Sequence, residues 1–172
     1  MPRLFVAVWP PPDVLDVIAA MPRPPLAGAR WTTRKQWHVT LRFLGRIDDA
    51  QESELRSILA ETAARSGPVQ ARAGPSPRRL GQSIWALPVD GLGPLAESVL
   101  ASTSRLGEPP THRQFQGHIT LARARRPRAL AGLPVPEVEA AWTVSEVTLV
   151  SSDLRPDGAR YEIVDRWGLG RG

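Results

Sequence analysis

The first half of the chain alternates apolar runs with segments of helical spacing. Residues 3–9, RLFVAVW, form an apolar run typical of a buried strand, and apolar residues at helical spacing follow the PPPD segment at 10–13. Asp48 and Gln51 give the capping-box signature of a second helix that extends to about residue 66. Further strands are predicted at residues 29–31 and 37–45. The residues expected to face inward from the two helices are Val14, Val17, Ile18, Met21, Leu55, Ile58, Leu59 and Thr62.

The second half repeats this order of elements. A proline in the first turn opens a helix predicted at 94–106, and the turn RPDG at 155–158 joins a closing hairpin, after which residues 168–172 are expected to fray. The strands predicted in this half are 69–73, 84–89, 118–124, 144–151 and 160–167. The pattern therefore predicts a single domain over residues 1–172, of the α+β class, with two lobes and mostly antiparallel strands.

A glycine pattern at 91–96, GLGPLA, matches the fingerprint of dinucleotide-binding sites. In such a site a second parallel strand ends in an acidic residue about twenty positions later. Here the predicted helix continues into GEPPTH at 107–112 without that strand. The segment is therefore interpreted as a loop and a helix start, and no cofactor is predicted.

Two of the three histidines stand in the same short motif, WHVTL at 37–41 and GHITL at 117–121. By composition alone, two such phrases would arise in roughly one chain in a few thousand. Because side chains alternate along a strand, the histidine and threonine of each motif are expected to share the face opposite the core. The core face of the first motif strand is expected to carry Trp37, Val39, Leu41 and Phe43.

A pair of imidazoles suits a reaction that takes one proton and gives another near neutral pH. The hydroxyl groups of Thr40 and Thr120 can donate hydrogen bonds to phosphate oxygens. Arg42 is expected on the same face as His38, where its guanidinium would add a charge-assisted contact. The motifs therefore predict acid–base catalysis on a phosphate, without a covalent intermediate.

Other chemistries find less support in the sequence. Two histidines can bind a metal, but neither motif carries a third ligand at short spacing, such as the pattern H-E-x-x-H, so no metal is predicted. The serine-hydrolase motif G-x-S-x-G is missing. The chain also has no cysteine, which excludes a disulfide framework, a thiolate nucleophile and a Cys-ligated metal.

Charge and the N-terminal segment bear on partners and location. The formal charge is +5, with 21 Arg against the single Lys35, a preference that suits forked contacts to phosphate and equally fits a GC-rich genome. Prolines interrupt the N-terminal apolar run too early for a signal peptide or a membrane span. A cytoplasmic protein without a membrane partner is expected.

At these residues the sequence resembles the two-histidine phosphoesterase superfamily, and within it the RNA 2′,3′-cyclic phosphodiesterases, also called 2′-5′ RNA ligases or LigT-like proteins. The likeness spans nearly the whole chain. One position differs: the residue before the second motif histidine is often proline in the family and is Gly117 here. The phrases that carry it are RLFVAVWPP at 3–11, WHVTLRFLG at 37–45, FQGHITLAR at 115–123 and ARYEIVDRW at 159–167.

The resemblance implies a bilobal fold with pseudo-twofold symmetry, two mostly antiparallel sheets with helices on the outer faces, and a central cleft. It implies the opening of RNA 2′,3′-cyclic phosphate ends to 2′-phosphates, with 2′-5′ ligation as the reverse reaction, and no metal, ATP or other cofactor. His38 would donate a proton to the leaving 3′-oxygen and His118 would accept one from water, while Thr40 and Thr120 would bind the phosphate. A monomer that acts on RNA is expected.

Three further residues are candidates for substrate binding: Arg42, Phe115 and Arg123. Arg123 stands an odd number of positions after His118, so alternation places it on the core side unless the strand bulges. Phe115 would stack on a nucleobase. The tryptophans that could do the same, Trp31 and Trp37, are expected mostly to fill the core, and the loop residues His112 and Arg113 are expected to be solvated.

Two rival functions remain open at this point. One is a non-catalytic module that binds RNA or a nucleotide by its phosphate, although a pure binder has no need of two imidazoles where Arg or Lys would serve. The other is a phosphodiesterase of small cyclic nucleotides, which would differ only in the basic surface around its cleft.

Overall fold

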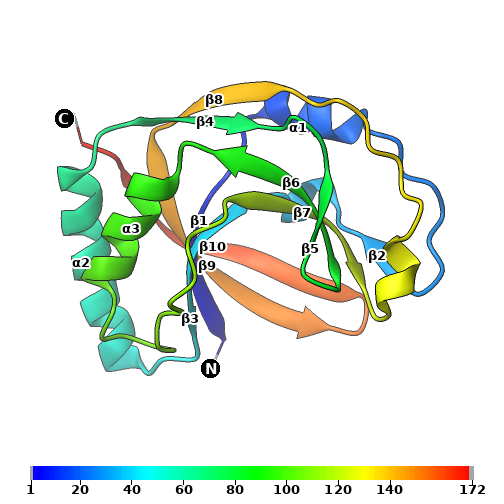
Figure 1. Ribbon diagram of the computed structural model, residues 1–172. Coiled ribbons are helices and arrows are strands. Elements are labelled where there is room, and N and C mark those ends of the chain that lie inside the picture. Colours follow the sequence, from blue (N-terminus) through cyan, green and yellow to red (C-terminus); the bar gives the residue numbers. More distant parts are fainter. Residues whose placement is uncertain (1, 171–172) are drawn as a thin grey trace.

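The computed structural model describes residues 2–170 and is shown in Figure 1. Its helices are α1 (Pro12–Ala19), α2 (Asp49–Arg65) and α3 (Gly93–Ser102), with short 3-10 turns at Arg34–Gln36 and Pro127–Leu130. Its strands are β1 (Arg3–Val8), β2 (Ala29–Trp31), β3 (Val39–Gly45), β4 (Val69–Ala73), β5 (Arg78–Leu80), β6 (Ile84–Asp90), β7 (His118–Ala124), β8 (Ala140–Val144), β9 (Glu146–Arg155) and β10 (Gly158–Gly168).

All neighbouring strands pair antiparallel, in the order β10-β9-β1-β3-β7-β6-β4-β8, with β2 added to β7 and β5 added to β6. The two motif strands, β3 and β7, meet in the middle of this order, where Val39 pairs with Ile119. Both residues are fully buried. The two expected sheets are therefore joined into one curved sheet by a narrow contact between equivalent residues of the two motifs.

The helices cover the outer side of this sheet. Figure 1 shows α2 and α3 side by side at one end of the molecule and α1 near the opposite end, beneath β8. Helix α2 begins at Asp48, whose carboxylate accepts the N–H of Gln51 at 2.8 Å, so the capping box predicted from the sequence is confirmed. Helix α3 packs against β3 and α1 against β8, so each lobe is covered by a helix from the other half of the chain.

Most of the predicted elements are confirmed, and the differences lie in short or exposed segments. Strands β5 and most of β8 were not predicted, and α3 ends at Ser102 rather than near residue 106. Val17 was expected to face inward but is 39% exposed. The tail is held rather than frayed as far as it is described, because the N–H groups of Leu169 and Gly170 donate to the carbonyls of Ser145 and Ala63. The last two residues, 171–172, lie outside the described residues.

Within residues 2–170, no helix combines the length and the apolar character that crossing a membrane would require.

Candidate active site

Each motif strand contains a bulge at the same motif position. In β3, Thr40 pairs with Ala7 and Arg42 with Val6, which leaves Leu41 without a partner on β1. In β7, Thr120 pairs with Ala86 and Ala122 with Trp85, which leaves Leu121 as the extra residue. A bulge inserts one residue and so reverses the alternation of faces beyond it. The same local irregularity therefore redirects the end of both strands.

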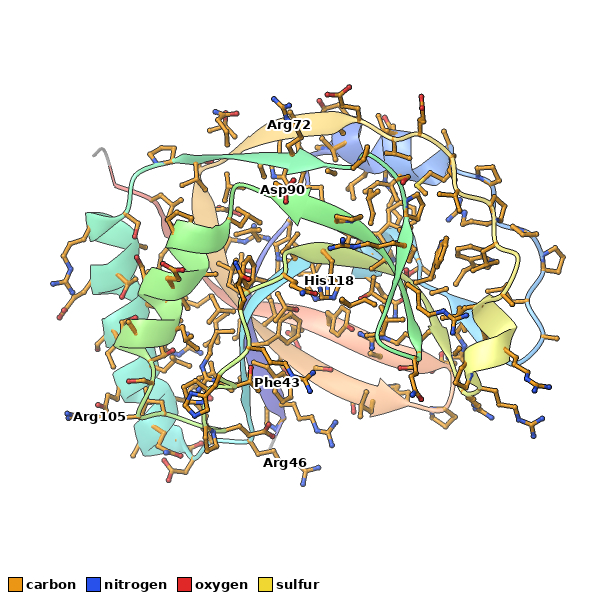
Figure 2. The ribbon with its side chains drawn as sticks, in the orientation of Figure 1. Phe43, Arg46, Arg72, Asp90, Arg105 and His118 are labelled. Atoms are coloured by element: carbon orange, nitrogen blue, oxygen red, sulfur yellow. The ribbon has the colours of Figure 1, made fainter. Side chains whose placement is uncertain are left out.

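The bulge in β3 overturns the expected positions of Arg42 and Phe43. Arg42 was predicted on the cleft face but is only 6% exposed, and its guanidinium donates to the main-chain carbonyls of Phe43, Leu106 and Glu108. Phe43 was predicted in the core but is 40% exposed. Figure 2 shows His118 in the middle of the molecule, between the upper strands and the β9–β10 hairpin, and Phe43 below it. Arg42 is thus a structural residue, and Phe43 takes its place at the cleft.

The bulge in β7 has the corresponding effect on Arg123. Simple alternation places this residue on the core side, but the reversal turns it to the cleft, where it lines the same cavity as His38, Thr40 and Phe43. This cavity has a volume of about 780 Å³. His118 and Thr120, on the same strand as Arg123, are half-buried and are not part of the cavity lining. Arg123 therefore occupies in β7 the position that Phe43 occupies in β3.

Both motif histidines are oriented by the same main-chain hydrogen bond. Nδ1 of His38 lies 2.7 Å from the carbonyl oxygen of Gln36, and Nδ1 of His118 lies 2.8 Å from that of Gln116. Since a carbonyl can only accept, the proton of each neutral ring resides on Nδ1 and leaves Nε2 unprotonated. Nε2 of His38 lies 3.0 Å from Oγ1 of Thr40. Each ring can accordingly accept a proton at Nε2 when neutral and donate it when charged.

Three aromatic side chains surround the ring of His38. The ring centroids of Phe5, Trp9 and Tyr161 lie 5.0, 5.2 and 5.0 Å from it. The pKa of His38 is lowered from 6.5 to about 4, mainly by burial and in smaller part by the positive charges of Arg123 and His118, against the opposing effect of the Gln36 carbonyl. In the free protein at neutral pH, His38 is therefore uncharged.

The pKa of His118 is also lowered, mainly by burial and further by Arg123 and Arg78. The positive charge of Arg123 thus contributes to the lowering of both imidazole pKa values. The antiparallel pair of Val39 with Ile119 places the two motifs side by side and in opposite directions. The imidazole and hydroxyl of each motif therefore stand on adjacent strands, on either side of this pair.

The remaining candidates from the sequence are not all brought to the cavity. Phe115 packs against the hydrophobic core, so the structure gives no support to its expected stacking role. Trp37 is 1% exposed and belongs to the core, whereas Trp31 lines the cavity. The loop residues His112 and Arg113 are exposed, as expected.

The aromatic surround of His38 was missed from the sequence. A signal for it existed, because residues 3–9 carry no polar residue after Arg3, and such a strand is buried on both faces. Leu4, Val6 and Val8 pack in the main core. The alternate residues Phe5 and Ala7 form a second apolar cluster with Val150, against which Trp9, Tyr161 and Ile163 pack.

No group of three His, Cys, Asp or Glu side chains that could hold a metal ion comes together among residues 2–170.

The chain is similar to known proteins in sequence and in structure. A family model described as LigT-like phosphoesterase matches residues 8–74. A protein of Thermus thermophilus named RNA 2′,3′-cyclic phosphodiesterase is 31% identical over 97% of this chain and 90% of its own length. A Bacillus subtilis protein of the same name is 29% identical over 71% of each chain.

Solved structures extend the similarity to the whole fold. A crystal structure of a Thermus thermophilus protein superposes with a TM-score of 0.86 at 27% identity and covers 98% of both chains. The crystal structure of E. coli LigT complexed with 3′-AMP gives a TM-score of 0.81 at 28% identity, again over 98% of both chains. The α+β fold with its curved antiparallel sheet is thus shared with these proteins.

Proposed function

The chain belongs to the LigT-like phosphoesterase family, and from this premise we propose that it is an enzyme that hydrolyses the 2′,3′-cyclic phosphate ends of RNA to 2′-phosphates. The observation that carries the proposal is the pair of imidazoles, each with Nδ1 fixed by a main-chain carbonyl at 2.7 or 2.8 Å, so that Nε2 is the unprotonated atom of the neutral ring. The names of the relatives support the choice of substrate.

In the proposed reaction a water oxygen attacks phosphorus while one imidazole removes the water's proton at Nε2. The bond between phosphorus and the 3′-oxygen breaks, and the other imidazole gives its Nε2 proton to that oxygen. The products are a 2′-phosphate and a free 3′-hydroxyl, and the two imidazoles exchange protons with solvent before the next turnover. The same sequence, with a 5′-hydroxyl of RNA attacking in place of water, would form a 2′-5′ linkage, and its reversal would cleave that linkage.

The proposal assigns the donor role to His38 and the acceptor role to His118. His38 must then be charged in the complex, although its pKa is about 4 in the free protein. A bound phosphate anion favours the charged form of a neighbouring imidazole and so raises its pKa. The assignment therefore requires substrate binding and proton uptake to be coupled.

A bridging sulfur tests which ring is the donor. A thiolate leaves without a proton more readily than an alkoxide, so a substrate with sulfur in place of the 3′-bridging oxygen bypasses the donor. His38→Ala should recover most of its lost rate on this substrate, whereas His118→Ala should not. Recovery by His118→Ala alone would exchange the two roles.

The phosphate oxygens would be held by the hydroxyls of Thr40 and Thr120 and by the guanidinium of Arg123. Phe43 presents an exposed aromatic ring in the same cavity, beside which a nucleobase would stack. We expect this machinery to work without metal or nucleotide cofactor, in a single bilobal, monomeric and cytoplasmic domain. Gel filtration would test the oligomeric state.

The direct test is incubation of an RNA oligonucleotide that ends in a 2′,3′-cyclic phosphate, followed by determination of the position of the product phosphate. The expected product is a 2′-phosphate, formed by the wild-type protein and not by His38→Ala or His118→Ala. A 3′-phosphate product would overturn the proposed bond cleavage. Tight binding without turnover would favour a phosphate-binding module instead.

A further inference from the structure

The cavity continues beyond His38, Thr40 and Phe43 into a groove between β2, the end of β7 and the β9–β10 hairpin. No aspartate or glutamate is among the residues that line the cavity. Five of these residues are arginines: Arg3, Arg30, Arg123, Arg125 and Arg155. The groove is therefore strongly positive, and positive charge of this kind attracts a polyanion.

Register places three of these arginines on one face. Arg30 on β2 pairs directly with Arg123 on β7, so both side chains project to the cleft. The main-chain N–H of Arg125 donates to the carbonyl of Gly28 at 3.0 Å, which continues the pairing beyond β7. Arg125 stands two residues after Arg123 and thus about 7 Å farther along the strand, on the same side. Arg30 and Arg125 are diagonal neighbours, about 7–8 Å apart and within reach of a common anion.

The hairpin turn leaves room for Arg30 above it. The guanidinium of Arg30 donates to the carbonyl of Pro156 at 3.3 Å. A Cβ atom at Gly158 would lie 2.9 Å from Nη1 of Arg30, so this glycine keeps the space open. Gly158 also has a φ of +125°, a conformation that glycine adopts without strain. The main chain of the turn therefore holds the Arg30 side chain in place, and the positive charge of Arg30 is not neutralised there.

Neutralising partners are scarce around the groove. Arg155 is paired with Asp153 at 2.9 Å. Among residues 2–170, Arg3, Arg30, Arg123 and Arg125 form no salt bridge with a carboxylate. Like charges this close repel one another, and a bound anion would relieve that repulsion. One cyclic phosphate beside His38 would occupy Arg123 and leave Arg30 and Arg125 without a counter-ion.

We propose that Arg30 and Arg125, here called the outer arginine pair, bind the phosphate on the 5′ side of the terminal nucleotide. The proposal rests on the function proposed above and narrows its substrate from any 2′,3′-cyclic phosphate to an RNA strand with at least one further phosphate. Trp31 also lines the cavity beside Arg30, with its Nε1 fixed to the carbonyl of Pro24 at 2.7 Å. Its ring offers a stacking surface for the preceding base.

A 5′-phosphate tests the outer pair without the rest of an RNA chain. Adenosine 2′,3′-cyclic phosphate is compared with the same compound carrying a 5′-phosphate, which supplies the second anion alone. Charge-assisted contacts predict a kcat/KM at least about tenfold higher for the 5′-phosphorylated compound. In the double variant Arg30→Gln, Arg125→Gln this ratio should fall to about one.

The salt dependence of the reaction gives a second test. For a tetranucleotide substrate, the slope of log kcat/KM against log salt concentration should be shallower in the double variant than in the wild type, by about 0.7 for each phosphate that the protein no longer neutralises.

Arg105→Gln is the control for the substitution itself, because it removes one arginine charge in the same way from a site that Figure 2 shows at the far edge of the molecule beside α2 and α3. The control should keep the tenfold ratio. A ratio near one in the wild-type protein, or a double variant that slows both compounds equally, would overturn the outer pair while the hydrolysis itself stands. If neither compound nor the RNA oligonucleotide of the direct test is hydrolysed, the proposed function fails. Calorimetry can then still test the outer pair by comparing the affinities for adenosine 2′-phosphate with and without a 5′-phosphate. The outer pair predicts tighter binding of the compound that carries the 5′-phosphate.

Discussion

The ring of His38 donates from Nδ1 to the main-chain carbonyl of Gln36 at 2.7 Å, and the side chain of Gln36 holds that carbonyl in place. Oε1 of Gln36 accepts from the N–H of Thr33 at 2.9 Å, and Nε2 donates to the carbonyl of Ala159 at 2.7 Å. The residue that orients His38 is thus tied to the 3-10 turn before β3 and to the start of β10.

Replacement of Gln36 should therefore impair catalysis through the orientation of His38. Gln36→Ala is expected to lower kcat about tenfold with a smaller effect on KM, because loss of orientation raises the barrier to proton transfer. Nitrogen NMR of the His38 ring should report a mixture of tautomers in place of Nδ1–H alone. Gln116→Ala is the matched control, since Gln116 offers His118 the same carbonyl. Equal effects of both variants on kcat and on the tautomers would refute the positioning role of the Gln36 side chain.

The two imidazoles should act as one unit. His38→Ala and His118→Ala are each expected to remove most of the activity, and the double variant should lose little more, because either loss already breaks the proton relay. Steady-state kinetics on an RNA cyclic phosphate would measure this, with EDTA present throughout. Strictly multiplicative losses, or activity abolished by EDTA, would contradict metal-independent catalysis by the pair.

The pH dependence of kcat/KM should be bell-shaped with its maximum below pH 6.5. The free enzyme must hold one proton on the pair, and burial lowers the pKa of both His38 and His118 from 6.5. The limbs of the bell belong to the coupled pair rather than to either ring. Initial rates between about pH 3.5 and 8.5 at constant ionic strength would locate them, and a maximum above pH 7 would show that the lowered values do not govern the reaction.

Folding stability should fall as the pH drops from about 6.5 toward 4. In the unfolded chain His38 binds a proton near pH 6.5, but in the folded protein only near pH 4, so acid favours the unfolded state over this interval. The free energy of unfolding is therefore expected to be higher above pH 6.5 than near pH 4, by an amount of the order of 3 kcal/mol for His38. Urea unfolding at pH 7 and pH 4.5 should show a smaller loss for His38→Gln than for the wild type. His112→Gln, at an exposed loop position, should behave like the wild type.

Thr40→Val and Thr120→Val should each reduce kcat by about ten- to a thousandfold, because each removes a hydroxyl that we propose donates to the phosphate oxygens. Thr62→Val serves as a control for the loss of a buried hydroxyl, since Thr62 bonds only within α2, to the carbonyl of Ile58 at 2.8 Å. Wild-type kinetics in both motif variants would show that the two threonines have a structural role and do not take part in catalysis.

Arg42 should matter for stability and little for turnover. Arg42→Met keeps much of the buried volume but leaves the carbonyls of Leu106 and Glu108 without their donor, at an expected cost of about 2–4 kcal/mol. Thermal unfolding would measure the cost. At temperatures well below the unfolding midpoint of the variant, kcat/KM should differ from the wild-type value by less than about threefold. A hundredfold loss of activity in a protein of unchanged stability would return Arg42 to the phosphate site.

The sequence by itself determined most of the elements and identified the proposed catalytic pair. Hydrophobic spacing and the Asp48–Gln51 capping box located α2, and the repeated motif identified His38 and His118, because these signals depend only on residues close together in the chain. Alternation also placed His38 and Thr40 on one face correctly. It is a local rule, and it holds for as long as the strand stays regular.

Only the tertiary structure decided what surrounds the pair. Bulges at Leu41 and Leu121 exchanged the expected faces of Arg42 and Phe43 and turned Arg123 toward the cleft. A bulge is set by pairing with a neighbouring strand, and no residue type in these motifs announces it. The aromatic rings around His38 belong to Phe5 in β1, to Trp9 just after β1, and to Tyr161 in β10. Strand β10 lies more than a hundred positions after β1 in the chain. The effect of these rings on the pKa of His38 arises from burial, which exists only after the chain has folded.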